Sequence, residues 1–131
     1  MATQCWPPCA RLPEPRGPTR YPMRMSAFIC LSTCPDRETA ERIADALVEA
    51  RLAACVNIVP GVASVYRWQG GIERDDELLL IIKTSQDRMP ALREALPRLH
   101  PYELPELIAV EARDGLPAYL DWVQAETRPL P

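Results

Sequence analysis

The stretch ACVNIVPGVASVYRW, residues 54–68, is the part of the chain that decides the fold. It is rich in Val and Ile and alternates in polarity, which is typical of a β-strand. The residues Gln-Gly-Gly at 69–71 mark a turn, and Glu73–Thr84 reads as a returning strand. The two segments predict a β-hairpin with arms of about 12 to 15 residues, against about 5 to 6 for a usual strand.

The two arms of this hairpin carry different signals. Pro60-Gly61 interrupts the first arm, and a proline inside a strand belongs at an edge or a bulge, so we expect that strand to bend there. The run Leu78–Ile82 is apolar on both faces of the second arm. Such continuity indicates a central strand that is covered on both sides.

Upstream of the hairpin, the sequence predicts a strand and then a helix. Ala27–Thr33 is a short β-rich run. An amphipathic helix is expected from Asp36 to Arg51, because acidic residues open it and apolar residues recur at helical spacing. The apolar positions are Ala40, Ile43, Ala44, Leu47 and Val48.

Downstream of the hairpin, the same reading gives a helix, a strand and a short final helix. We expect Ser85 to cap the second helix, whose apolar positions Met89, Leu92, Leu96 and Leu99 are spaced by three and four residues. Glu106–Ala112 reads as a fourth strand, and a last helix follows Gly115.

The order β-α-β-β-α-β plus a C-terminal helix predicts an α+β, ferredoxin-like split βαβ fold. Its antiparallel sheet would carry two helices on one face. One small domain cannot cover both long hairpin arms, and an exposed strand edge promotes aggregation, so we expect the far part to pair with another chain. A hairpin that projects into solvent is the alternative.

Composition limits the class of protein. The 131 residues are 47% hydrophobic with a formal net charge of −3, which suits one globular domain and argues against a nucleic-acid partner. No run approaches the roughly 20 apolar residues of a membrane span. Residues 1–24 hold six of the 15 prolines and are expected to be a disordered extension of a domain at 25–128.

The five cysteines and the lack of an apolar export signal favour a reducing cytoplasm. Cys5 and Cys9 lie in the Pro-rich extension, and their spacing only weakly resembles a metal-binding pair. Cys30 and Cys55 stand in apolar strand contexts, where we expect small core residues.

The one histidine of the chain, His100, lies in the segment Leu99-His-Pro-Tyr-Glu-Leu-Pro-Glu106. Two prolines make this connection stiff, since each fixes its own φ and restrains the residue before it. A stiff loop that carries an imidazole, a phenol and carboxylates suits a ligand site. It also suits a rigid connection without ligand.

Several motifs, taken in order, resemble the CutA family of divalent-cation tolerance proteins. They are residues 53–61 (AACVNIVPG), Ser64, residues 66–68 (YRW), residues 71–73 (GIE), residues 82–84 (IKT) and residues 100–103 (HPYE). The resemblance implies a ferredoxin-like homotrimer joined through its long hairpins, similar in architecture to the PII signalling proteins. It also implies a role in copper or other divalent-cation tolerance, with copper bound by some members.

The chain departs from the family at two ligand positions. Ser32 stands where some members have a cysteine, while Cys34 lies two residues later, and Leu99 replaces the first of two histidines. A thiolate and an imidazole suit Cu(I), Cu(II) or zinc, so Cys34 and His100 are candidate metal ligands with Glu103 as a third. Glu106 or a neighbouring subunit is the alternative source of the further ligands. At a helix N-terminus, the pKa of Cys34 is expected to be lowered; the alternative is a partly exposed thiol at a helix cap.

The remaining candidates concern a second hypothesis, in which the trimer is a PII-like regulator or scaffold and its link to metal is indirect. Lys83, Tyr102 and Ser32 would then contact a small ligand or protein in a cleft between subunits. Tyr66 and Trp68 are expected at the trimer interface. Tyr102, Tyr119 and Trp122 either line a cleft or fill the core, of which we favour the core. No catalytic grouping is evident, so we do not expect an enzyme, and no organic cofactor is implied.

Overall fold

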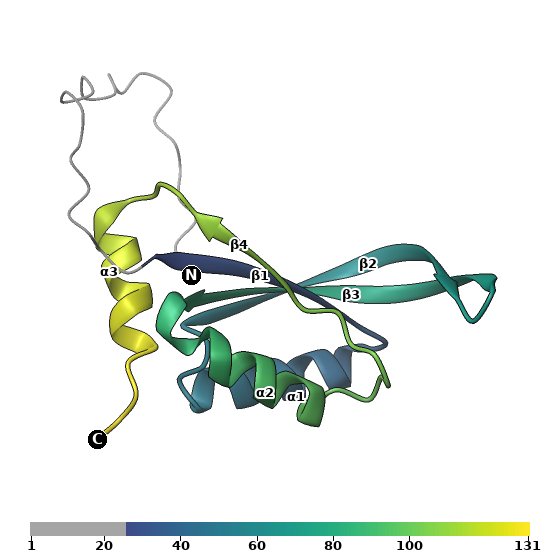
Figure 1. Ribbon diagram of the computed structural model, residues 1–131, viewed down its shortest axis with the longest axis horizontal. Helices are drawn as coiled ribbons and strands as arrows, with labels where there is room; N and C mark the ends of the chain where they lie inside the picture. Colours follow the sequence, from purple (N-terminus) through teal and green to yellow (C-terminus); the bar gives the residue numbers. More distant parts are fainter. Residues whose placement is uncertain (1–25) are drawn as a thin grey trace, which may run out of the picture.

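The protein is described by a computed structural model that covers residues 26–131 (Figure 1). Its elements follow the predicted order, with a short 3₁₀ turn η1 added before the second long helix. Their bounds are β1 Ala27–Cys34, α1 Arg37–Glu49, β2 Cys55–Trp68, β3 Gly71–Ser85, η1 Gln86–Arg88, α2 Met89–Leu99, β4 Ile108–Ala112 and α3 Pro117–Glu126.

The four strands form one antiparallel sheet in the order β2-β3-β1-β4. Helices α1 and α2 lie side by side under one face of it, and α3 stands at one end (Figure 1). This confirms the predicted α+β, ferredoxin-like arrangement. The apolar run Leu78–Ile82 lies in β3, between β2 and β1, which confirms that it is a central strand.

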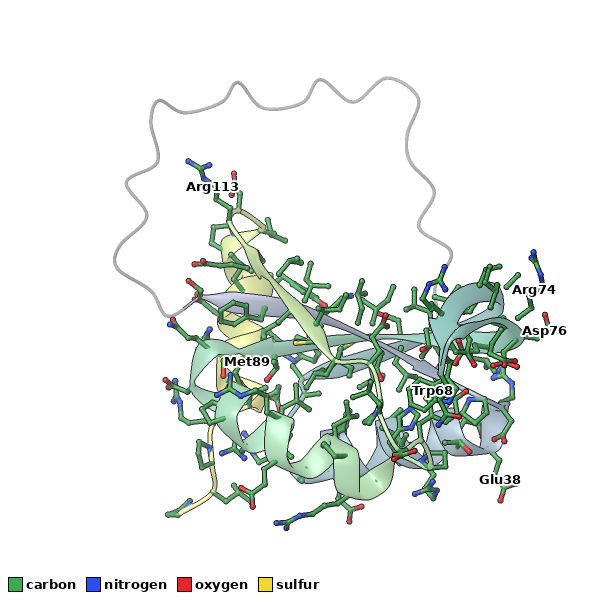
Figure 2. The ribbon with its side chains drawn as sticks, turned by 45° about the vertical axis from the view of Figure 1, so that its right-hand side comes forward. Glu38, Trp68, Arg74, Asp76, Met89 and Arg113 are labelled. Carbon is green, nitrogen blue, oxygen red and sulfur yellow. The ribbon has the colours of Figure 1, made fainter. Side chains whose placement is uncertain are left out.

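The long hairpin is present, with 14 residues in β2 and 15 in β3. It runs well beyond the helices, and Arg74 and Asp76 project away from its outer part (Figures 1 and 2). The register shifts between Val59 and Val62, where Gly61 has a φ of +79°, so Pro60-Gly61 forms the expected bulge. Gln69 and Gly70 both have positive φ and close a two-residue turn of the type that suits twisted strands.

The main core lies between the sheet and the two helices. Cys30 and Cys34 of β1 lie opposite Ile82 and Leu78 of β3 and face α1 and α2. Buried members include Leu80 and Ile82 from β3, Ile43 and Leu47 from α1, and Leu92 and Leu96 from α2. Each fully buried side chain of this size contributes roughly 1.5 to 3 kcal/mol, which makes this layer the main source of stability.

The helix starts differ in part from the predictions. Asp36 is the N-cap of α1, and its carboxylate accepts a hydrogen bond from the Thr39 N–H (2.8 Å), which lowers the pKa of Asp36. Ser85 was predicted to cap the second helix, and this is wrong. The turn η1 intervenes, and the Ser85 hydroxyl instead accepts from Thr127 Oγ1 (2.9 Å), which ties β3 to the end of α3.

The sheet face away from α1 and α2 is only partly covered. Val123 of α3 packs there against Ala27 and Ala54, and the remainder is open, with Ile108 and Val110 each 58% exposed. Tyr119 and Trp122 were predicted in the core, and this is wrong: they pack against each other at the surface, with tilted rings whose centroids lie 5.5 Å apart.

Cys55 was also predicted in the core, and its exposure is intermediate. It lies opposite Lys83 on this same open face of the sheet, which explains why it is not enclosed.

Two further sequence predictions concern the N-terminal extension and membrane spans. The expected disordered extension, residues 1–24, lies outside the described residues. None of the helices within residues 26–131 has both the length and the apolar character needed to cross a membrane.

The main core predicts a sharp contrast between two neighbouring residues of α1. Leu47 has no exposed surface and Val48 is 44% exposed. Leu47→Ala should lower the free energy of unfolding by about 2 to 5 kcal/mol, and Val48→Ala should change it by no more than about 0.5 kcal/mol. Urea denaturation followed by circular dichroism measures both, and equal effects would contradict this placement of the core.

Candidate functional site

A cavity of about 810 Å³, which we call the hairpin cleft, opens between the outer half of β2 and the loop that follows α2. Its lining comprises residues 63–68 of β2, residues 101–104 and Glu106 of the loop, Thr33 at the end of β1 and Glu77 of β3. Thr33 lies opposite Leu79, two residues from Glu77, so both lie on the sheet face that α1 and α2 leave open. Ligand sites in proteins commonly have volumes of about 300 to 1,000 Å³.

Two tyrosine–carboxylate hydrogen bonds organise this region. The Tyr102 hydroxyl donates to Glu77 Oε2 (2.8 Å), and Glu77 is only 7% exposed. The Tyr66 hydroxyl donates to the carboxylate of Asp75. Burial and the neighbouring carboxylate raise the pKa of Tyr102 well above its usual range, and the Asp75 bond raises that of Tyr66 to about 12. Both phenols therefore stay protonated at neutral pH.

His100 holds the loop to the end of β1. Its Nε2 donates to the Thr33 carbonyl (2.7 Å), its Nδ1 accepts from the Tyr102 N–H (3.1 Å), and the ring is buried. This pattern defines the neutral imidazole with its hydrogen on Nε2. Arg42 of α1 steadies the same junction by donating to the Leu99 carbonyl (3.0 Å).

Cys34 and His100 do come together within one chain, with Sγ 3.9 Å from Nε2. The thiol is fully buried, so the interpretation of a partly exposed thiol is wrong. The expected lowering of its pKa is also wrong. Burial first, and then the charges of Glu77 and Asp36, raise the Cys34 pKa to about 11.

The third candidate ligand is placed differently. Glu103 is exposed and lines the hairpin cleft, whereas Cys34 and His100 are buried and are not part of its lining. Within residues 26–131, no three His, Cys, Asp or Glu side chains converge closely enough to hold a metal ion.

The residues predicted to contact a ligand in a cleft between subunits do not lie together. Tyr102 lines the hairpin cleft, as do Tyr66 and Trp68, which were predicted at a subunit contact. Ser32 faces the helices, is fully buried, and its hydroxyl has no hydrogen-bond partner among residues 26–131. Lys83 lies on the open sheet face towards α3, with Nζ 5.7 Å from the centre of the Tyr119 ring. Neither Ser32 nor Lys83 lines the cleft.

The sequence analysis did not single out Glu77, whose carboxylate accepts the hydrogen bond of the Tyr102 hydroxyl. The sequence contains a signal for it, because Glu77 directly precedes the apolar run Leu78–Ile82 and so lies next to a buried segment. A carboxylate in such a place needs a hydrogen-bond donor, which the fold supplies from a loop 25 residues away.

Known proteins are similar to this chain over most of its length. Residues 28–126 match the family described as CutA1 divalent ion tolerance protein. The divalent-cation tolerance protein CutA of Thermus thermophilus is 52% identical over 99 residues, 76% of this chain and 96% of that protein. The chloroplastic protein CutA of Arabidopsis thaliana is 46% identical over 102 residues, 78% of this chain and 56% of that protein.

A solved structure supports the same assignment. The crystal structure of CutA from Xylella fastidiosa is 49% identical, with a TM-score of 0.76, and the match covers 78% of this chain and 98% of that one. The fold and these matches place the chain among the α+β proteins of the divalent-ion tolerance class. This chain belongs to the CutA1 family.

The buried thiol gives a prediction about chemical reactivity. With a pKa of about 11 instead of 9.0, Cys34 holds about a hundredfold less thiolate at neutral pH, and the thiolate is the reactive form. Cys34 should therefore react with iodoacetamide at least a hundredfold more slowly in the folded protein than in urea. Peptide mass spectrometry identifies the modified cysteine, and rapid native labelling of Cys34 would contradict the geometry.

Proposed function

We propose that this chain acts in divalent-cation tolerance as a homotrimer of the cytoplasm whose working site is the hairpin cleft. Its effect on metal tolerance would pass through a ligand bound in that cleft, as in a PII-like regulator. The observation that carries the proposal is the cleft itself, a cavity of about 810 Å³ that joins polar and aromatic groups from three strands and a stiff loop.

The state of His100 argues against a preformed metal centre. A metal needs a free lone pair on the imidazole, and here Nε2 donates to Thr33 while Nδ1 accepts from Tyr102. Ligation through Nε2 would break the Thr33 bond and force a hydrogen onto Nδ1, against the Tyr102 N–H. It would also require Cys34 to lose a proton that its raised pKa retains.

Copper binding is a second candidate, supported by one distance. Cys34 Sγ and His100 Nε2 are 3.9 Å apart. A thiolate–metal–imidazole unit with the metal between its ligands spans at most roughly 4.3 Å, if the bond lengths resemble those of zinc. Cu(I) or Cu(II) could occupy that space if the histidine gave up its hydrogen bonds, and Glu103 would have to move towards the metal.

A trimer is supported by the surface that the single chain leaves open. Ile108 and Val110 are more than half exposed on the uncovered sheet face, and the outer hairpin exposes Val65, Tyr66 and Ile72. Apolar surface arranged in this way is typical of a contact between protein chains. Tyr66 and Trp68 lie on that part of β2, so the cleft would lie beside the subunit boundary.

A copper titration separates the two candidates. In a Cys5→Ser, Cys9→Ser background, we expect weak copper binding that changes less than about threefold on His100→Ala or Cys34→Ser. Both ring nitrogens of His100 are hydrogen-bonded, and the Cys34 thiol is buried and protonated. Competition of Cu(I) and Cu(II) against a chelator of known affinity gives the constants. Tight binding that is lost in either variant would favour the copper centre instead.

The trimer has its own test. Sedimentation equilibrium should give a mass three times that of the 14.7 kDa chain. Val110→Asp places a charge on the exposed apolar face and should shift the mass towards one chain, because a buried unpaired charge is strongly unfavourable. Glu49→Gln on α1, away from this face, is the control. A wild-type protein that sediments as a monomer would rule the trimer out.

A further inference from the structure

We infer that the ligand of the hairpin cleft is a small organic dication, of the class of the aliphatic diamines. The inference rests on the proposed function, in which this cleft is the working site. It is carried by the combination of charge, aromatic surface and spacing that the cleft presents.

The charge of the lining is negative. The lining includes three glutamates, Glu77, Glu103 and Glu106, and one arginine, Arg67. Two negative charges therefore remain uncompensated within the lining, which matches a ligand with two positive charges. An anionic ligand such as a nucleotide would meet repulsion from this surface.

The aromatic side chains add a second kind of cation recognition. Tyr66, Trp68 and Tyr102 line the same cavity as the carboxylates. The face of an aromatic ring attracts an ammonium group, and tryptophan does so best. Aromatic walls also cover the methylene groups between two amines, which a hydrated metal ion lacks.

The spacing of the carboxylates selects an extended organic cation over a metal ion. No three of the acidic, histidine or cysteine side chains within residues 26–131 converge on a single point. Glu77 enters from β3, whereas Glu103 and Glu106 belong to the loop across the cleft. Acidic groups on separate walls can each receive one ammonium of a chain-like molecule.

At the inner end of the cleft, the Glu77 carboxylate is oriented and can accept further hydrogen bonds. The Glu77 carboxylate is held by the Tyr102 hydroxyl through one oxygen, Oε2. A carboxylate has about four acceptor sites, so this single bond leaves capacity for an ammonium group. Tyr102 is itself fixed through the His100 Nδ1, and the groups are therefore oriented before a ligand arrives.

The test is calorimetric titration of the full chain with 1,4-diaminobutane, with 1,4-butanediol as the neutral analogue and copper(II) chloride as the metal probe. Saturable binding of the diamine but not the diol is expected. Glu103→Gln should weaken the diamine about fivefold, as expected for the loss of one exposed ion pair. Trp68→Leu should weaken it by a similar factor, and Trp68→Phe should largely restore it.

Glu49→Gln is the matched control, because Glu49 is an exposed glutamate of α1 outside the cleft and should leave the diamine affinity unchanged. Glu103 is exposed too, so Glu103→Gln is expected to fold even if a Trp68 variant fails.

Three results would overturn the inference, and they differ in their meaning. Equal binding of diamine and diol would show that the cleft does not recognise the positive charge of its ligand. Copper binding that depends on Glu103, without diamine binding, would leave the cleft as the working site but with a metal ion as its ligand. No binding of any probe to the wild-type chain would reject the inference and would leave the cleft as the working site for a ligand of another class.

Discussion

The imidazole of His100 is the constraint on which the site depends. Its two nitrogens bond the Thr33 carbonyl and the Tyr102 N–H, and so fix the loop after α2 against the end of β1. That loop supplies one wall of the hairpin cleft and places the Tyr102 hydroxyl on Glu77. A buried imidazole with both nitrogens satisfied costs little and orients its neighbours, whereas an unsatisfied one would be expensive.

The same constraint divides the site into a closed part and an open part. Cys34 is enclosed beside His100 and its pKa is raised to about 11, so at neutral pH it is a small protonated core residue. The groups that a ligand can reach are instead Tyr66, Trp68 and Glu103 on the cleft walls. The cleft, and not the buried thiol, is therefore the part of the site that a ligand can contact.

Much of the fold could be predicted because it depends on local patterns. The alternation of residues 54–68, the bulge at Pro60-Gly61 and the helical spacing of α1 are each visible in the sequence, and each is confirmed. The failures concern long-range contacts. Ser85 pairs with Thr127 instead of capping a helix, and the buried state of Cys34 follows from packing between β1 and α2, which no local pattern reports.

The most direct test of this account is the tautomer of His100. Because it is the one histidine of the chain, its two ring nitrogens can be assigned without ambiguity by long-range ¹H–¹⁵N NMR at pH 7.5. The hydrogen bonds of the ring predict the hydrogen on Nε2 and an unchanged spectrum when stoichiometric Cu(I) is added. A hydrogen on Nδ1, or a copper-induced shift of the Nε2 resonance, would contradict it and make His100 a metal ligand.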